Sequence, residues 1–115
     1  MSVRMEDLAG MDFSDVASGE RLVPVAPGDV LLHEFMEPMG LSANALAKAL
    51  KVPTNRVTGI INGTRNITAD TALRLQAAFG VSATAWLGLQ SRYNLEQAEA
   101  ELADKIAAEV HRLAA

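Results

Sequence analysis

The chain has 115 residues, which is enough for one domain with a single core but not for two. Half of the residues are apolar and none is cysteine, so disulfides, thiolate metal ligands and a cysteine nucleophile are excluded. The formal net charge is −4, from 14 acidic and 10 basic residues. No apolar run reaches the ~18 residues of a membrane-spanning helix, and the N-terminus is acidic where a signal peptide is positive. We therefore expect a soluble, cytoplasmic protein without a membrane partner.

Acidic and basic residues are unevenly distributed along the chain. Residues 1–37 hold eight acidic side chains against two basic ones, and residues 96–112 hold five against two. Residues 42–69, by contrast, hold four basic side chains and no acidic one. The chain is acidic on average, but its middle segment is basic. This segment indicates a surface that faces an anion, and the alternative is a chance cluster of basic residues on a solvated helix pair. The four basic residues are Lys48, Lys51, Arg56 and Arg65.

The first predicted elements are an arm and a helix. Residues 1–23 show no sustained apolar period, and we interpret them as a mobile or partner-dependent N-terminal arm. The segment that follows contains Pro24 and Pro27, which mark a boundary before the first helix. Asp29 stands where it complements a helix dipole, and the apolar spacing after it predicts a helix of about three turns that ends near residues 38–40.

Two short helices follow, joined by a tight turn. Ser42 is a suitable N-cap for a helix of eight or nine residues, and residues 51–53 form the turn because the proline at its end cannot continue a helix. The second helix covers about residues 53–61 and ends at Gly63, which suits a left-handed C-cap. Two brief helices joined in this way, with the small Ala47 where they cross, are typical of a helix-turn-helix motif.

The remaining chain predicts further helices and no strand. Thr68 and Ser82 are N-caps of two of them, and the second continues through Tyr93. Residues 96–115 extend an apolar stripe of helical period, which must be covered by the domain itself, a second protomer or another protein. We therefore expect an all-α chain in which a domain over residues 24–95 lies between the arm and a C-terminal amphipathic extension. The stripe consists of Leu95, Ala98, Leu102, Ile106, Val110 and Leu113.

The outer face of the second short helix is polar, and a helix of this kind fits a major groove. Asn55 and Asn62 can pair with adenine, Arg56 with guanine, and Thr58 with an acceptor or a thymine methyl group. Gly59 inside this helix costs on the order of 1 kcal/mol relative to alanine. We interpret it as a close backbone approach to DNA, with sequence drift as the alternative. The expected phosphate contacts are Ser42, Asn44, Lys51 and Arg65.

Several motifs, taken in their order and spacing, resemble one known family. They are a Pro-Gly pair before the first helix, EPMGLS, ALAKAL, INGTR, ITADTALRL and WLGLQSRYNL. None is specific alone. Together they cover residues 25–95, and this part of the sequence is similar to HigA-type antitoxins, members of the lambda-repressor-like (XRE) helix-turn-helix class.

The resemblance implies a five-helix domain and a homodimer that binds an inverted-repeat operator in double-stranded DNA and represses its own toxin-antitoxin operon. It also implies direct neutralisation of a HigB/RelE-like mRNA endonuclease toxin, and no cofactor. Trp86, Leu87 and Tyr93 match the family's C-terminal signature, which implies a role in packing or at the dimer surface. With the recognition helix placed by the resemblance, the expected base contacts are Thr54, Asn55, Arg56, Thr58, Gly59 and Asn62.

Three positions depart from the family pattern. Lys51 stands where the turn usually has glycine, so a non-glycine residue must adopt a left-handed conformation at roughly 1 kcal/mol. Ala43 replaces a frequent glutamine, which removes a phosphate-contacting amide, and Gly59 replaces a frequent glutamate. These changes affect the expected affinity and operator sequence more than the fold.

Three other functions fit the sequence less well. A protein-interaction module would keep a degenerate DNA-binding surface, and a stand-alone XRE-type transcriptional regulator would have no toxin partner. An enzyme is the weakest alternative, because His33 and His111 belong to no metal-spaced pair or nucleophile-base motif. Glu34 and Glu37 are three residues apart on a helix and fit a solvated edge better than an acid-base pair. We expect no catalytic residue and no metal site.

Overall fold

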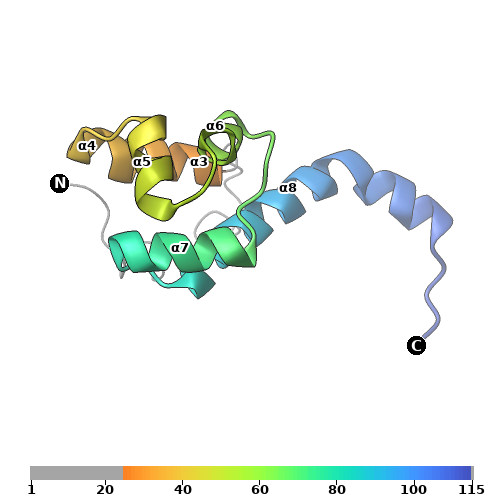
Figure 1. The fold of residues 1–115 in the computed structure, drawn as a ribbon. Helices are drawn as coiled ribbons and strands as arrows, with labels where there is room; N and C mark the ends of the chain where they lie inside the picture. Colours follow the sequence, from red (N-terminus) through yellow and green to blue (C-terminus); the bar gives the residue numbers. More distant parts are fainter. Residues whose placement is uncertain (1–24, 115) are drawn as a thin grey trace.

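The computed structural model describes residues 25–114, so the arm predicted for residues 1–23 lies outside the described residues. Within them every regular element is a helix (Figure 1). The segments α3, η1 and α4 follow one another without a break and form one helix, so the described part of the chain has five helices and confirms the predicted all-α, lambda-repressor-like fold. In chain order the segments are α3 (Pro27–Val30), η1 (Leu31–Met36), α4 (Glu37–Met39), α5 (Ala43–Leu50), α6 (Thr54–Asn62), α7 (Ala69–Phe79) and α8 (Ala83–Glu109).

The first helix has the length that the sequence predicted. It begins at Pro27, which suits the first helical position because an N–H there would have no intrahelical partner. Its middle segment, η1, has π-helical hydrogen bonding, and the N–H of Glu37 donates to the carbonyl oxygen of Leu32. The helix ends at Gly40, which has a left-handed conformation with φ 66°.

Buried apolar side chains pack α5 against α6. Ala47 is buried at the crossing, so the two helices approach closely. Each large apolar side chain removed from water here contributes about 1.5–3 kcal/mol. The helix-turn-helix motif is therefore held by its own small core as well as by the rest of the domain. The other buried residues of this core are Leu46, Leu50, Val57 and Ile60.

An aromatic cluster joins the first helix to the last two. The ring centroid of Phe35 lies 5.1 Å from that of Phe79 in α7 and 5.3 Å from that of Trp86 in α8. Tilted aromatic pairs of this kind contribute about 0.5–1.5 kcal/mol each beyond their buried area. Trp86 is fully buried, so of the two roles that the sequence left open for it, packing is the one observed.

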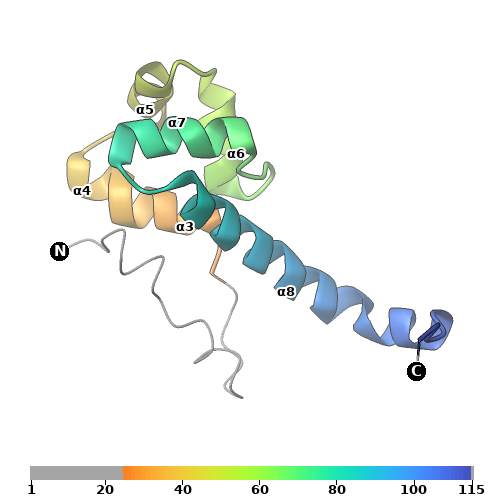
Figure 2. The same cartoon turned by 90° about the horizontal axis from the view of Figure 1, so that it is seen from below.

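Helix α8 is a single helix of 27 residues, and it continues past residue 95 without a break. Its first half packs on the domain, whereas its second half extends away from it (Figures 1 and 2). Leu95, Leu102 and Ile106 are 58%, 40% and 49% exposed, so the domain does not cover the apolar stripe. The helix ends at Glu109, and the prediction that the helical stripe continues to Leu113 is therefore wrong at its last turn.

Candidate nucleic-acid interface

The turn between α5 and α6 has the conformation that the sequence required. Ser42 caps α5, because its Oγ accepts a hydrogen bond of 3.0 Å from the N–H of Ala45. Lys51 ends α5 in the left-handed region with φ 61° and ψ 45°, and it is the one non-glycine residue with positive φ among residues 25–114. Lys51 thus has the left-handed conformation that was predicted for it in place of glycine. Its side chain is exposed.

The N-termini of α5 and α6 are tied together by a side-chain hydrogen bond. Thr54, the first residue of α6, donates from its Oγ1 to the Oδ1 of Asn44 over 2.9 Å. This bond uses the carbonyl oxygen of Asn44, and the amide NH₂ is the part of that side chain that can donate to a phosphate. The N-termini of α5 and α6 therefore lie close together, and the partial positive charge of both favours anions.

The outer face of α6 carries the predicted polar residues. Val57 and Ile60 are buried, whereas Asn55 and Asn62 are exposed and Thr58 is partly exposed. The expected division between an inner apolar and an outer polar face is therefore present.

Gly59 has a role inside the protein. Its carbonyl oxygen accepts from the N–H groups of Thr64 and Arg65 at 2.9 and 3.1 Å. A Cβ at this position would lie 3.1 Å from the Cβ of Arg65, which is tighter than an ordinary contact. The absence of a side chain at Gly59 thus lets the segment after α6 fold back onto the helix, in addition to the DNA approach expected from the sequence.

Arg56 is turned toward α7. Its Nη1 lies 2.6 Å from the Oδ2 of Asp70, and the same oxygen lies 3.0 Å from the Nε of Arg74. The hydrogen bond from Arg74, followed by that from Arg56, lowers the pKa of the Asp70 carboxyl below its ordinary value. The partnership of Asp70 with Arg56, fourteen residues earlier, was not predicted from the sequence.

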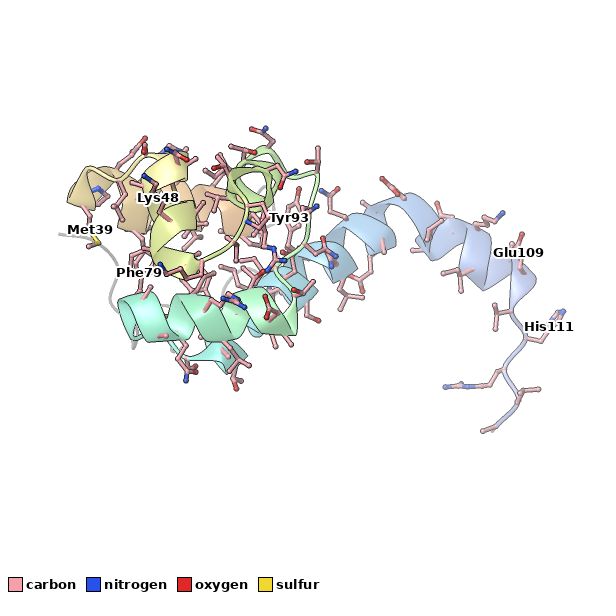
Figure 3. The ribbon with its side chains drawn as sticks, in the orientation of Figure 1. Met39, Lys48, Phe79, Tyr93, Glu109 and His111 are labelled. Atoms are coloured by element: carbon pink, nitrogen blue, oxygen red, sulfur yellow. The ribbon has the colours of Figure 1, made fainter. Side chains whose placement is uncertain are left out.

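The other basic residues of the middle segment are open to solvent. Lys48, which Figure 3 labels on α5, is exposed, as are Lys51 and Arg65. They come from α5, from the turn and from the segment after α6, so they surround the motif rather than lying on one helix. This placement is suited to backbone phosphates, which position a protein on DNA without carrying sequence information.

A buried glutamine anchors the segment that follows α6. The Oε1 of Gln90, in α8, accepts a hydrogen bond of 2.8 Å from the N–H of Ile67. Its Nε2 donates to the Oδ1 atoms of Asn66 and Asn94 at 3.2 and 3.0 Å. Gln90 belongs to the WLGLQSRYNL motif, but no role was predicted for it, because two of its three partners, Ile67 and Asn66, lie more than twenty residues earlier.

Leu87 and Tyr93, the other two residues of the C-terminal signature, lie at the edge of the domain. Leu87 is partly buried and packs against the core. Tyr93 is partly exposed, and its hydroxyl oxygen accepts a hydrogen bond of 2.6 Å from the Nε2 of Gln97. Both retain surface that another chain can contact.

The two histidines lie apart from this region. His33 Nδ1 and Glu37 Oε1 are 3.0 Å apart, and both side chains are more than half exposed. His111 lies beyond the far end of α8, near Glu109 (Figure 3). Among residues 25–114 no group of three or more His, Cys, Asp or Glu side chains is placed to hold a metal ion, and no helix there is long and apolar enough to cross a membrane.

Similarity to known proteins agrees with this geometry. Residues 32–86 match the helix-turn-helix family. Virulence-associated protein I of Dichelobacter nodosus is 48% identical over 85 residues, which are 73% of this chain and 79% of that protein. An addiction module antidote protein of the HigA family from Coxiella burnetii has a TM-score of 0.73 at 47% identity, over 79% of this chain and 99% of that one. Antitoxin HigA of Pseudomonas aeruginosa, solved with the higBA promoter, has a TM-score of 0.75 at 41% identity, over 79% and 99%.

The fold and the exposed polar face of α6 define a helix-turn-helix DNA-binding protein. The chain belongs to the HigA-type family of helix-turn-helix antitoxins. This is a family of DNA-binding regulators and not of enzymes, which agrees with the sequence interpretation.

Proposed function

We propose that the chain represses its own toxin-antitoxin operon by binding an operator, and neutralises a HigB/RelE-like mRNA endonuclease toxin by direct contact, in the cytoplasm. The observation that supports operator binding best is the surface around α6. A short helix presents a polar face there, beside exposed basic residues, in a chain whose net charge is −4. The Pseudomonas aeruginosa HigA relative was solved with a promoter, which supports the same function.

Within this proposal the side chains divide into two kinds of contact. Asn55, Thr58 and Asn62 read base edges from the outer face of α6, with Thr54 at its N-terminus and the partly exposed Gly59 alongside. Four residues around the motif hold phosphates and fix its position on the duplex. They are Ser42, Asn44, Lys51 and Arg65.

The operator is an inverted repeat and the binding unit a homodimer. Two protomers related by a two-fold axis place their α6 helices in successive major grooves, about 34 Å apart. The exposed apolar residues on α8, such as Leu95 and Leu102, give a second protomer a surface to cover. Tyr93 and Leu87 lie on the same helix and are partly exposed.

Hydroxyl-radical footprinting on the DNA upstream of the gene tests operator binding. We expect two protected segments about one helical turn apart, related by two-fold symmetry. Protection spread evenly along the fragment, or none, would contradict the proposal. Sedimentation of the protein alone and on the fragment gives the number of protomers bound.

The toxin partner is tested with the product of the neighbouring gene. The acidic second half of α8, with Glu99, Glu101 and Asp104 exposed, supports an attraction to a basic ribonuclease. Co-expression followed by purification of either chain should recover both. The complex should fail to cleave mRNA on ribosomes, whereas the partner alone cleaves it. A neighbouring product that neither binds nor cleaves would favour the stand-alone regulator instead.

A further inference from the structure

One chain of polar contacts joins α7 to the two helices of the helix-turn-helix motif. Arg56 of α6 and Arg74 of α7 both bind the Oδ2 of Asp70, at 2.6 and 3.0 Å. Arg74 also donates from Nη1 to the carbonyl oxygen of Leu50 over 2.9 Å. Leu50 is the last residue of α5 and precedes the strained Lys51, so the chain of contacts links the end of α5, the start of α7 and the side of α6.

The Arg56–Asp70 contact holds the side of α6, which its other contacts do not hold. Buried Val57 and Ile60 fix the inner face of α6, and the Thr54–Asn44 bond fixes its N-terminus. The backbone of Gly28 also lies against Ile60 on the inner face, so a rotation of this nine-residue helix about its own axis is opposed further only by contacts at its side. Arg56 points sideways to α7, and hydrogen bonds between ionised groups are about twice as strong as neutral ones, so the Asp70 contact resists that rotation.

The charges favour retention of these contacts on DNA. Between residues 42 and 74, Asp70 is the only acidic residue and five residues are basic. If Arg56 left Asp70 to contact a base, the carboxylate would keep only Arg74 as a partner beside the DNA phosphates. Two guanidinium groups on one carboxylate neutralise it and leave a net positive charge. We infer that Arg56 is a positioning residue, which sets the angle of the recognition helix through Asp70 and Arg74, and not the reader of a guanine.

This inference rests on the proposed operator binding, and a set of charge-neutralising variants tests it. Arg56→Gln, Asp70→Asn and the double variant are compared with the unmodified chain on the operator and on a scrambled duplex. Glu109→Gln, which removes an exposed ion pair with Lys105 at the far end of α8, is the matched control. Removing an acidic group near DNA should by itself strengthen binding, because less negative charge opposes the phosphates.

We expect the opposite for Asp70→Asn. It and Arg56→Gln should each weaken operator binding on the order of tenfold, and the double variant no further, because both remove the same contact. The control should leave the affinity unchanged. If Asp70→Asn binds the operator as well as the unmodified chain or better, while Arg56→Gln binds it weakly, Arg56 contacts DNA directly and the inference is wrong.

A panel of operators with each base pair changed in turn separates positioning from base reading. With a positioning role, Arg56→Gln lowers affinity for every member by a similar factor and keeps the base preferences. With a reading role, Arg56→Gln removes the preference at one base pair only. That result would overturn the inference. All measurements are made well below the thermal unfolding midpoint of each variant. If the unmodified chain itself shows no preference for the operator, the proposed function fails and this inference fails with it; the other adverse outcomes overturn the inference alone.

Discussion

The backbone of Gly28 lies directly against the carbonyl group of Ile60. A Cβ at Gly28 would overlap the carbonyl oxygen of Ile60 and lie 2.9 Å from both the carbonyl carbon of Ile60 and the Cα of Ile61. These atoms belong to the backbone of the recognition helix and cannot move aside as a flexible side chain can. The glycine therefore sets how closely α3 approaches α6.

Gly28→Ala should destabilise the protein by about 1–3 kcal/mol, because the added methyl group overpacks this contact. Gly88 is the matched control, since it lies inside α8 with nothing within 4 Å of an added Cβ. Gly88→Ala should stabilise the protein by about 0.5–1 kcal/mol through helix propensity alone. Urea unfolding of both variants measures the two changes. Equal effects of the two substitutions would contradict the close approach.

Lys51→Gly should change stability and DNA binding in opposite directions. Glycine adopts the left-handed conformation without steric strain, so we expect the free energy of unfolding to rise by up to about 1 kcal/mol. Loss of a phosphate contact should weaken binding to operator and random DNA alike and reduce the slope of log affinity against log salt by about 1. Thermal unfolding and a salt titration measure the two effects, with Lys105→Ala on the second half of α8 as the charge control. An unchanged salt slope would show that Lys51 does not contact phosphate.

Gln90→Leu should destabilise the protein by about 1–3 kcal/mol. The substitution leaves the N–H of Ile67 without its acceptor, and Ile67 is buried at 2% exposed. Gln97 in the same helix also donates a side-chain hydrogen bond but is exposed, so Gln97→Leu should change stability by no more than about 0.5 kcal/mol. Amide hydrogen exchange at Ile67 should speed up in the first variant only. Unchanged exchange at Ile67 would contradict the anchoring role of Gln90.

The pKa of His33 should lie above its ordinary value of 6.5, because Glu37 accepts a hydrogen bond from the imidazole and attracts its charge. A raised folded-state pKa stabilises the fold at pH values below 6.5, and this contribution is lost as the pH rises through the folded-state value. An NMR titration of His33 measures the pKa directly. In Glu37→Gln it should fall back toward 6.5, whereas an unchanged pKa would show that the pair does not form in solution.

Local signals in the sequence were sufficient for the elements of the fold. Ser42 predicted a capped helix start, and Gly63 predicted a left-handed helix end, because both act on the few residues beside them. Even there the side chain can differ from the expectation. Thr68 occupies the N-cap of α7 as predicted, but its hydroxyl makes no capping hydrogen bond.

The contacts that shape the candidate site could not be predicted in the same way. Arg56 has the sequence signature of a base reader, and only the folded chain brings it to Asp70. Gln90 is separated from Ile67 by 23 positions, and the approach of Gly28 to Ile60 joins the first helix to the third. Such pairs depend on tertiary packing, for which apolar period and capping residues carry no information. The stripe on α8 is similar, since its period predicted an apolar face but not what covers it.

In the proposed function α6 reads a DNA sequence. The most direct test is the ratio of affinities for the upstream DNA and for a scrambled duplex of equal length, measured at several salt concentrations beside Asn55→Ala/Thr58→Ala. We predict that the unmodified chain prefers its own upstream DNA by a factor on the order of 10³ or more, and that the double variant loses most of this preference while keeping its salt dependence. Equally weak binding of the unmodified chain to both duplexes would contradict sequence-specific recognition by this helix.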